Sequence, residues 1–381
     1  MANPNNDPNT TTTQTTSSWC TILTTAIGAV ILALIVIQIN SFDAAPYPPE
    51  ELAKAPSFKF PKVNAHTLHG SEIIGEGQLM QPEDILYDPK LDVIHTGCAD
   101  GWVKRIRVND SVIENWVNTG GRPLGLAHGY SDEIYVADDV KGILKITKDG
   151  EIEVLSTEAE GIKYGMADSV TVSKKGVLYF TDASMKYSMQ TYVYDFLEGR
   201  PYGRLMSYDL STKETKVLLR DLYFPNGAII SHDEEFIIYC ESPMMRCMRY
   251  YIQGEKEGTI DVFIDRLPGM PDNIHTDDLG RYSIAIPKEH TYAWDIIRRY
   301  PYIRKVYAFL QKYFNMPFVK KNGGTIFVDK EGKPLERFYD PGLKHVSTGK
   351  LMKKKLYLGT LYATAIFRLD LAQYPATATS P

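Results

Sequence analysis

The sequence predicts an all-β protein: a six-bladed β-propeller with an N-terminal transmembrane helix and a short helical insertion. Three observations predict this fold. A unit of short strands and turns recurs at intervals of about forty to fifty residues over roughly 300 residues, which is typical of propellers. The chain contains 25 Tyr and 14 Phe against 4 Trp, and aromatic rings suit pleated surfaces. One uncharged apolar segment near the N-terminus is long enough to cross a hydrocarbon core as a helix.

Composition and charge exclude several classes of protein. Of the 381 residues, 44% are hydrophobic and 23% charged, so the chain as a whole is neither disordered nor fibrous. A formal net charge of -5 argues against a nucleic-acid partner held by overall phosphate attraction. The 4 Cys are too few for a disulfide-dense scaffold, and no Cys or His residues have zinc-ligand spacing.

The chain begins with a tail and an anchor. Residues 1–18 are almost all Asn, Thr, Ser and Pro, so we expect them to be a disordered tail. Residues 19–42 carry no charge and predict a transmembrane signal anchor. A cleaved signal peptide is the alternative, but the preceding residues contain no Lys or Arg and the apolar run is long. The Pro-rich residues 43–64 are expected to be a linker.

The orientation of the anchor has to be inferred from a second signal. Neither flank is basic, because Asp7 precedes the apolar run and Asp43 follows it. The sequon Asn109-Asp110-Ser111 lies in a turn-like stretch and predicts glycosylation at Asn109. We therefore expect a lumenal or exoplasmic propeller in the secretory pathway, in the endoplasmic reticulum, the vacuole or the plasma membrane.

Residues 65–371 carry the repeats and are expected to form the propeller. In each unit a short apolar strand is followed by a second strand rich in aromatic and small residues, as in residues 170–172 and 177–182, and then by a third. A single four-stranded unit cannot bury both faces, whereas a closed ring of units can. Six such units predict six blades. Residues 372–381 are expected to be a disordered tail.

One segment interrupts the repeats. Residues 288–321 contain 8 Lys or Arg against 2 acidic residues, and their apolar side chains recur at helical spacing. We expect two short helices separated by Pro301. The insertion is interpreted as a helical cover on the propeller rim, or as a basic, aromatic face that lies on the membrane or forms a lid.

The residues just before each inner strand of a propeller meet around the central channel, and here many of them carry side-chain oxygen. Carboxylate and amide oxygens without His or Cys suit a hard cation such as Ca²⁺. The alternative is that Pro-Asn-Gly and Pro-Asp-Asn are only turn formers. Because several units carry oxygen at the same register, the sequence predicts one channel-bound Ca²⁺. The expected ligands are Glu83, Asn226 and Asp272, supported by Asp168 and Asn273.

The same motifs resemble those of the strictosidine synthase-like proteins, including the membrane-anchored branch of the adipocyte plasma membrane-associated protein type. More distantly they are similar to paraoxonases and gluconolactonases. The resemblance covers about Pro46 to Leu371 and implies a six-bladed propeller with a membrane segment. It rests on the phrases Glu83-Asp84, Pro225-Asn226-Gly227, Pro271-Asp272-Asn273, Gly121-Arg122-Pro123-Leu124-Gly125-Leu126 and Tyr179-Phe180-Thr181-Asp182.

The chain departs from the family at positions that carry its known chemistry. Strictosidine synthase uses a last-blade Glu as general base, but Ser347 or Thr348 falls there, and a hydroxyl cannot take a proton near neutral pH. Leu124 stands where paraoxonases have a His, and Ala167 replaces the third-blade Asn. His345 and Asp168 are the weak catalytic candidates that remain. A disulfide between Cys240 and Cys247 is not expected, because strand partners rarely meet its geometry.

Three functions follow from these residues. The first is Ca²⁺-dependent hydrolysis of a small ester or lactone. The second is a non-catalytic propeller in which the cation is structural and the rim or the basic insertion binds a partner. The third is condensation of an alkaloid precursor, which the missing Glu disfavours. All three place the anchor at residues 19–42 in a membrane, and residues 288–321 are a second candidate for membrane contact.

Overall fold

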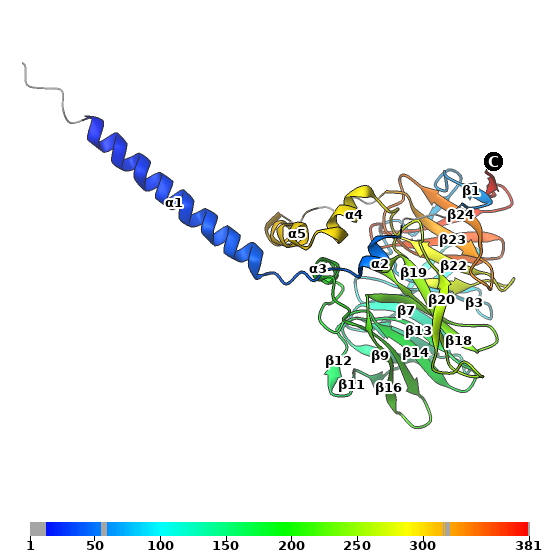
Figure 1. Cartoon of the computed structure of the whole chain (residues 1–381). Coiled ribbons are helices and arrows are strands. Elements are labelled where there is room, and N and C mark those ends of the chain that lie inside the picture. The colour runs from blue at the N-terminus through cyan, green and yellow to red at the C-terminus, as the bar shows by residue number, and fades with distance from the viewer. Residues whose placement is uncertain (1–12, 55–58, 315, 317–320, 380–381) are drawn as a thin grey trace, which may run out of the picture.

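The computed structural model of the chain describes residues 13–54, 59–314, 316 and 321–379. Among these residues, six sheets of four or more strands form a ring, which confirms the six-bladed propeller (Figure 1). Blades 1 to 3 contain β3 (Leu86–Asp88), β4 (Val93–Gly97), β5 (Trp102–Arg107), β6 (Ile113–Asn118), β7 (Pro123–His128), β8 (Ile134–Asp138), β9 (Gly142–Ile146), β10 (Ile152–Ser156), β13 (Ala167–Val172), β14 (Val177–Asp182), β15 (Gly203–Asp209) and β16 (Thr215–Leu222).

Blades 4 to 6 complete the ring. They contain β17 (Pro225–Ile230), β18 (Phe236–Glu241), β19 (Arg246–Tyr251), β20 (Ile260–Ile264), β21 (Ile274–Thr276), β22 (Tyr282–Ile286), β23 (Gly323–Val328), β24 (Pro334–Asp340), β25 (Val346–Met352), β26 (Lys355–Thr360) and β27 (Ile366–Asp370). A small hairpin, β11 (Glu158–Ala159) and β12 (Ile162–Lys163), and the 3-10 turn η1 (Ser242–Met244) lie outside this pattern.

The core lies between the blades. In β14 of blade 3, Leu178 and Phe180 are fully buried and pack against Tyr135 and Ala137 of β8 in blade 2. Side chains on a strand alternate between the two faces of its sheet, so each blade can bury apolar residues against both neighbours. This is the physical reason why the repeated apolar strands of the sequence form a ring rather than independent sheets.

The ring is closed by strands from both ends of the chain. The N-terminal strand β2 (Glu72–Ile74) pairs antiparallel with β27 and becomes the outer strand of blade 6. The strand β1 (Lys62–Asn64) extends blade 5, parallel to β24, and β28 (Thr377–Ala378) pairs with β1. Parts of the expected linker and of the expected C-terminal tail are therefore strands, because each supplies hydrogen bonds to an otherwise open sheet edge.

The N-terminal helix α1 spans Thr13–Ser41 and projects away from the propeller (Figure 1). It starts before the expected anchor, because residues 13–18 of the expected tail are its first turns; residues 1–12 lie outside the described part of the chain. Within Trp19–Ser41 the most apolar 18-residue stretch has a mean hydropathy of 2.7, and none of that stretch is buried. Within the described residues it is the one helix long and apolar enough to cross a membrane.

Helices cover one end of the channel. The insertion forms α4 (Tyr292–Arg299) and α5 (Pro301–Phe314), the two helices expected there, and Pro301 opens the second one. A third helix, α3 (Tyr192–Glu198), lies between β14 and β15, and a short helix, α2 (Pro49–Leu52), follows α1. Trp294 of α4 and Phe196 of α3 pack in one buried cluster with Met166, Phe224 and Met270. We call α3, α4 and α5 the cap.

The structure corrects one expectation about the cysteines. Cys240 of β18 and Cys247 of β19 stand directly opposite each other and form a disulfide, with an S–S distance of 2.00 Å. The expectation was wrong because the antiparallel register places these two side chains face to face, which spacing alone does not show. Cys98 is a buried free thiol.

Candidate functional site

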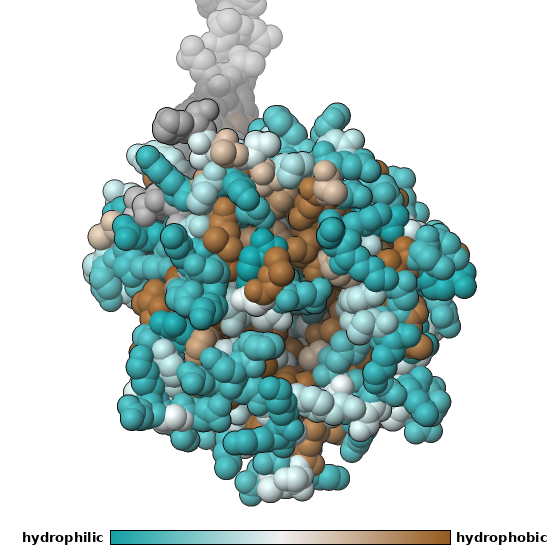
Figure 2. Space-filling model, turned by 90° about the vertical axis from the view of Figure 1, so that its right-hand side faces the viewer, coloured by the Kyte–Doolittle hydropathy of each residue, from teal (hydrophilic) through white to brown (hydrophobic). Residues whose placement is uncertain are grey.

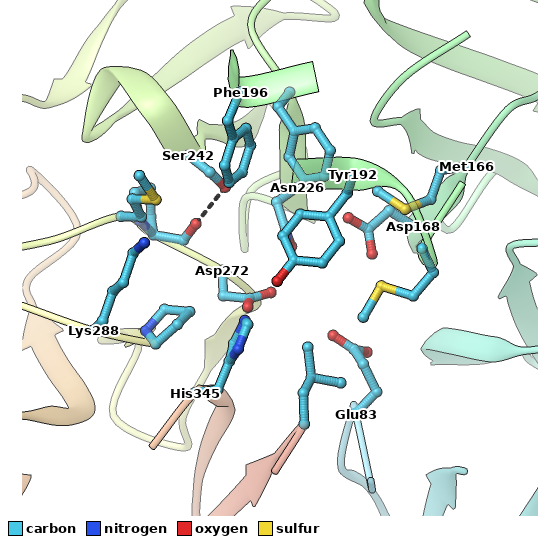
Figure 3. Close-up of a pocket in the computed structure, with 16 residues that line it drawn as sticks. Glu83, Met166, Asp168, Tyr192, Phe196, Asn226, Ser242, Asp272, Lys288 and His345 are labelled. Carbon is cyan, nitrogen blue, oxygen red and sulfur yellow. Dashed lines mark hydrogen bonds between the residues drawn. The ribbon is translucent and has the colours of Figure 1, made fainter. Parts of the chain in front are cut away.

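Four oxygen-bearing side chains from four blades line one cavity at the capped end of the channel. Glu83 precedes β3, Asp168 and Asn226 lie at the starts of β13 and β17, and Asp272 precedes β21. All four line a cavity with about 620 Å³ of empty space, and Figure 3 shows them directed toward its centre. We call these four residues the oxygen floor and this space the first cavity. The sequence analysis selected these four residues because they lie near the starts of inner strands, and the fold brings their side chains together.

Glycines allow this convergence. A Cβ atom on Gly125 would lie 2.6 Å from the backbone oxygen of Asp168, and one on Gly227 would lie 2.5 Å from the backbone oxygen of Asp272. Real Cβ contacts are not that short, so any other residue would push the neighbouring inner strands apart. The glycines that directly follow Pro123-Leu124 and Pro225-Asn226 therefore hold these neighbouring blades close enough for the floor side chains to face the same space.

The oxygen floor has unpaired atoms. Glu83 Oε2, Asp168 Oδ2, Asn226 Oδ1 and Asp272 Oδ1 are all buried, and none has a hydrogen-bond partner. Each buried polar atom left unpaired costs about 1–3 kcal/mol. Four such oxygens around one cavity form a set of ligand atoms that suits a hard cation.

The carboxyl groups of the floor perturb one another. Burial, and after it the neighbouring carboxylates of Asp139 and Asp84, raises the pKa of Asp168 to about 8. Burial, and next the charges of Asp272 and Asp168, raises the pKa of Glu83, while burial and Asp168 raise that of Asp272. The site therefore favours either protons or a bound cation, because three bare carboxylates in a closed space repel.

The two remaining oxygen-bearing residues have other partners. Asn273 Nδ2 donates a 2.7 Å hydrogen bond to Glu83 Oε1, so Asn273 orients Glu83. Asp84 accepts hydrogen bonds from the backbone N–H groups of Ile85 and Leu126 and lies 2.9 Å from His275 Nε2. Burial opposes ionisation of Asp84, but the His275 ring lowers its pKa overall. Asp84 and Asn273 line a separate cavity that Asp168, Asp272 and Glu83 do not line.

The uncapped end of the propeller differs in character. Figure 2 shows this face, opposite α1, as mostly hydrophilic at its periphery with apolar side chains toward the centre.

Among the residues that the structure describes, no three His, Cys, Asp or Glu side chains form a group that could hold a metal by themselves. An ion on the oxygen floor would therefore need the amide oxygen of Asn226 and oxygen atoms from solvent or a ligand.

Aromatic and sulfur-containing side chains form the walls above the floor. The apolar residues that line the first cavity are Met166, Met189, Tyr192, Phe196, Phe224, Met270 and Leu361. Tyr192 and Phe196 belong to α3, which the sequence analysis did not predict. The sequence does contain one signal of this helix, the glycine after Tyr192–Glu198. Gly199 has a φ of 65°, the left-handed conformation that ends helices.

His345 lies at the edge of the first cavity. Its ring stacks on Tyr362 with a centroid distance of 5.6 Å and meets the edge of Tyr192 at 6.4 Å. Figure 3 shows it on the same side of the cavity as Asp272. Of the two catalytic candidates, then, Asp168 lies on the floor and His345 on the wall, where a ligand above the floor would meet both.

The hydroxyls at the expected position of the family Glu do not line this cavity. Ser347 and Thr348 are fully buried; Ser347 Oγ donates to the backbone oxygen of Glu83 at 2.7 Å, and Thr348 Oγ1 lies 2.8 Å from His275 Nε2. Both hydroxyls hold the inner strands together. Arg122, which the sequence analysis did not select as a site residue, is buried, and its charge partly opposes the rise in the pKa of Glu83 that burial causes.

Asn109 lies in the exposed turn between β5 and β6. The side chain is therefore accessible from solvent, as a glycosylation acceptor must be. Glycosylation of Asn109 stays a prediction.

The chain is similar in sequence to known proteins. A family profile described as strictosidine synthase matches residues 168–255. The chain is 45% identical over 355 residues to the Arabidopsis thaliana protein named STRICTOSIDINE SYNTHASE-LIKE 6, covering 92% of this chain and 95% of the relative. It is 32% identical over 330 residues to the adipocyte plasma membrane-associated protein of Gallus gallus, covering 80% and 79%.

Solved structures share the fold at low sequence identity. A gluconolactonase from Xanthomonas campestris has a TM-score of 0.59 and 13% identity, covering 83% of this chain and 96% of that chain. A calcium-binding regucalcin from Agrobacterium tumefaciens has a TM-score of 0.56 and 13% identity, covering 84% and 98%.

Proposed function

This chain belongs to the strictosidine synthase-like family, and we propose that it is a membrane-anchored, Ca²⁺-dependent hydrolase of esters or lactones. The observation that carries the proposal is the set of four buried, unpaired oxygens from four blades on the floor of one apolar-walled cavity. The solved structures titled gluconolactonase and calcium-binding regucalcin share the fold and support the proposed lactone hydrolysis and calcium binding.

The donor set fits Ca²⁺ better than the other common metals. Glu83, Asp168, Asn226 and Asp272 would hold the ion, and Asn273 would keep Glu83 in place through its 2.7 Å hydrogen bond. Oxygen-only donors in a flexible arrangement favour calcium over zinc or copper. When bound, such an ion supplies Lewis acidity, which polarises a carbonyl oxygen and makes water more acidic.

The chain's own side chains supply the rest of the reaction. The aromatic and Met walls bind the apolar part of the substrate and keep bulk water out. Hydrolysis adds one water across the acyl carbon–oxygen bond and yields a carboxylic acid and a hydroxyl. His345 or Asp168 takes the proton of the attacking water and returns a proton to the departing oxygen.

A purely structural cation is the second candidate, because the same floor would stabilise the ring without any turnover. Condensation of an alkaloid precursor ranks last, since Ser347 and Thr348 are buried in hydrogen bonds and no carboxylate takes the place of the family base.

A substrate panel separates these functions. The full chain in detergent or nanodiscs is assayed with aryl esters and lactones, with Ca²⁺ and after treatment with a chelator. We expect turnover that the chelator removes and added Ca²⁺ restores. Turnover that persists in chelator rules out the calcium dependence, and no turnover of any panel member, together with bound Ca²⁺, assigns the ion a structural role.

The propeller is proposed to lie on the lumenal or exoplasmic side of the membrane. The Cys240–Cys247 disulfide supports this, because disulfides persist in oxidising compartments and are rare in the cytosol. When the chain is expressed in a eukaryotic secretory system, we expect a glycan on Asn109. Endoglycosidase treatment should increase gel mobility for the wild type and not for Asn109→Gln, whereas an unchanged wild-type band with four free thiols places the propeller in the cytosol.

A further inference from the structure

A second cavity lies beneath the cap, beside the first. It holds about 600 Å³ of empty space, and its lining includes Met245, Trp294, Ile297 and Tyr307. Met270 and Lys288 line both cavities, so the two spaces are neighbours that share these side chains as a wall. The first cavity ends at the oxygen floor, while the second runs toward α5.

The walls of this second cavity suit a flexible apolar chain. Met245 and Met270 are unbranched and adapt to irregular shapes, and Trp294 presents a large apolar surface. The ion-pairing groups nearby are directed to each other, since Asp295 Oδ1 lies 2.8 Å from His290 Nε2 and 3.1 Å from Arg298 Nη2. His290, Asp295 and Arg298 therefore pair with one another and do not require a charged ligand.

The cap is held against the end of the anchor helix. Arg304 of α5 is fully buried and donates to the backbone oxygens of Leu197, at 3.0 Å, and of Ala45. Ala45 N donates to Glu198 O at 2.8 Å, and Tyr47 Oη donates to Phe196 O at 2.8 Å. The connection between anchor and propeller is therefore pinned into the cap rather than left as a free tether.

The outer face of α5 lies level with the last turn of α1. Gln38 Nε2 donates to Tyr313 Oη at 2.5 Å, and Lys305 Nζ donates to Asn40 O at 3.3 Å. Tyr302 and Phe314 are exposed on the same helix, 56% and 67%. Tyr residues and cationic helices with exposed aromatic side chains are typical of the membrane interface. Figure 1 shows α5 beside the end of α1 that is nearer the propeller.

From these contacts we infer that the second cavity binds the apolar tail of a membrane-partitioned ester or lactone whose carbonyl lies over the oxygen floor. This inference rests on the proposed hydrolase function and names its substrate class: amphiphiles with an alkyl chain, rather than small water-soluble esters. The shared wall at Met270 and Lys288 and the contacts of the cap with the end of α1 are what select this ligand.

The test compares two variants on the same helix. Ala293 lines the second cavity and Tyr292, next to it, is 79% exposed and does not. The full chain in phosphatidylcholine nanodiscs is assayed with p-nitrophenyl octanoate and p-nitrophenyl acetate. We expect the octanoate-to-acetate ratio of kcat/KM to fall at least tenfold in Ala293→Trp and to stay at the wild-type value in Tyr292→Trp. Equal ratios in all three proteins overturn the inference.

A binding measurement keeps the inference testable without turnover. In a Trp19→Phe background, 12-bromododecanamide should quench tryptophan fluorescence more than 4-bromobutanamide does, and Trp294→Phe should remove that difference. Quenching without hydrolysis of any ester leaves the tail site standing while the hydrolase function fails. Hydrolysis without a difference in quenching or in chain-length preference overturns the tail site alone.

Discussion

Replacing Asp272 with asparagine is expected to abolish Ca²⁺ binding and to lower ester or lactone turnover by about 100-fold or more. Asp272 Oδ1 is buried and unpaired on the oxygen floor, and its carboxylate contributes charge that an amide does not. The near-isosteric change keeps the volume of the side chain. Isothermal titration with Ca²⁺ and steady-state kinetics on the same preparation measure the two effects.

Asp195→Asn is the matched control. Asp195 is a buried carboxyl of α3 in the cap that does not line the first cavity. Burial, with a smaller contribution from the charge of Glu198, raises its pKa to about 8, so it is mostly neutral at pH 7 and an amide replaces it with little cost. Both binding and turnover should survive in this variant. If Asp272→Asn binds Ca²⁺ as the wild type does, the oxygen floor is not the calcium site.

Removing the cation is expected to lower the melting temperature by about 5 °C at pH 8 and by much less at pH 5. In the ion-free protein the pKa values of Glu83, Asp168 and Asp272 are raised in the folded state. The folded chain then binds protons more tightly than the unfolded chain, so this contribution to stability is present below about pH 4. It is lost as the pH rises through about 8, the folded-state pKa of Asp168.

We expect Ca²⁺ to reverse that trend, because a bound ion would replace the protons on the same oxygens. An ion at one hundred times its dissociation constant stabilises the folded state by about 2.7 kcal/mol. Thermal melts from pH 5 to pH 8, with Ca²⁺ or with a chelator, should therefore diverge as the pH rises. A melting-temperature difference that is constant with pH, or greatest at pH 5, contradicts the proposed competition between protons and the ion.

Much of the fold could be predicted because it is encoded locally. The apolar and aromatic residues at 177–182 predict a strand wherever they lie, and Pro301 separates two helical runs because proline favours a first turn. The oxygen-bearing residues Glu83, Asn226 and Asp272 could be selected since each stands at the same point of its repeat. Helix α3 was missed although Gly199 marks its end, because seven residues inside a long connection carry little periodicity.

Local sequence patterns were enough to predict the apolar N-terminal helix, the six repeats and the register that directs acidic and amide side chains to one axis. These depend on spacing along the chain, which hydrophobic burial and turn chemistry translate directly into structure. Three contacts depend on the tertiary structure: Asp84 pairs with His275, Cys240 forms a disulfide with Cys247, and Arg304 of α5 donates to Ala45 in the segment that follows α1. Those contacts join residues from separate elements or strands, and their partners are selected by ring closure and helix packing rather than by local pattern.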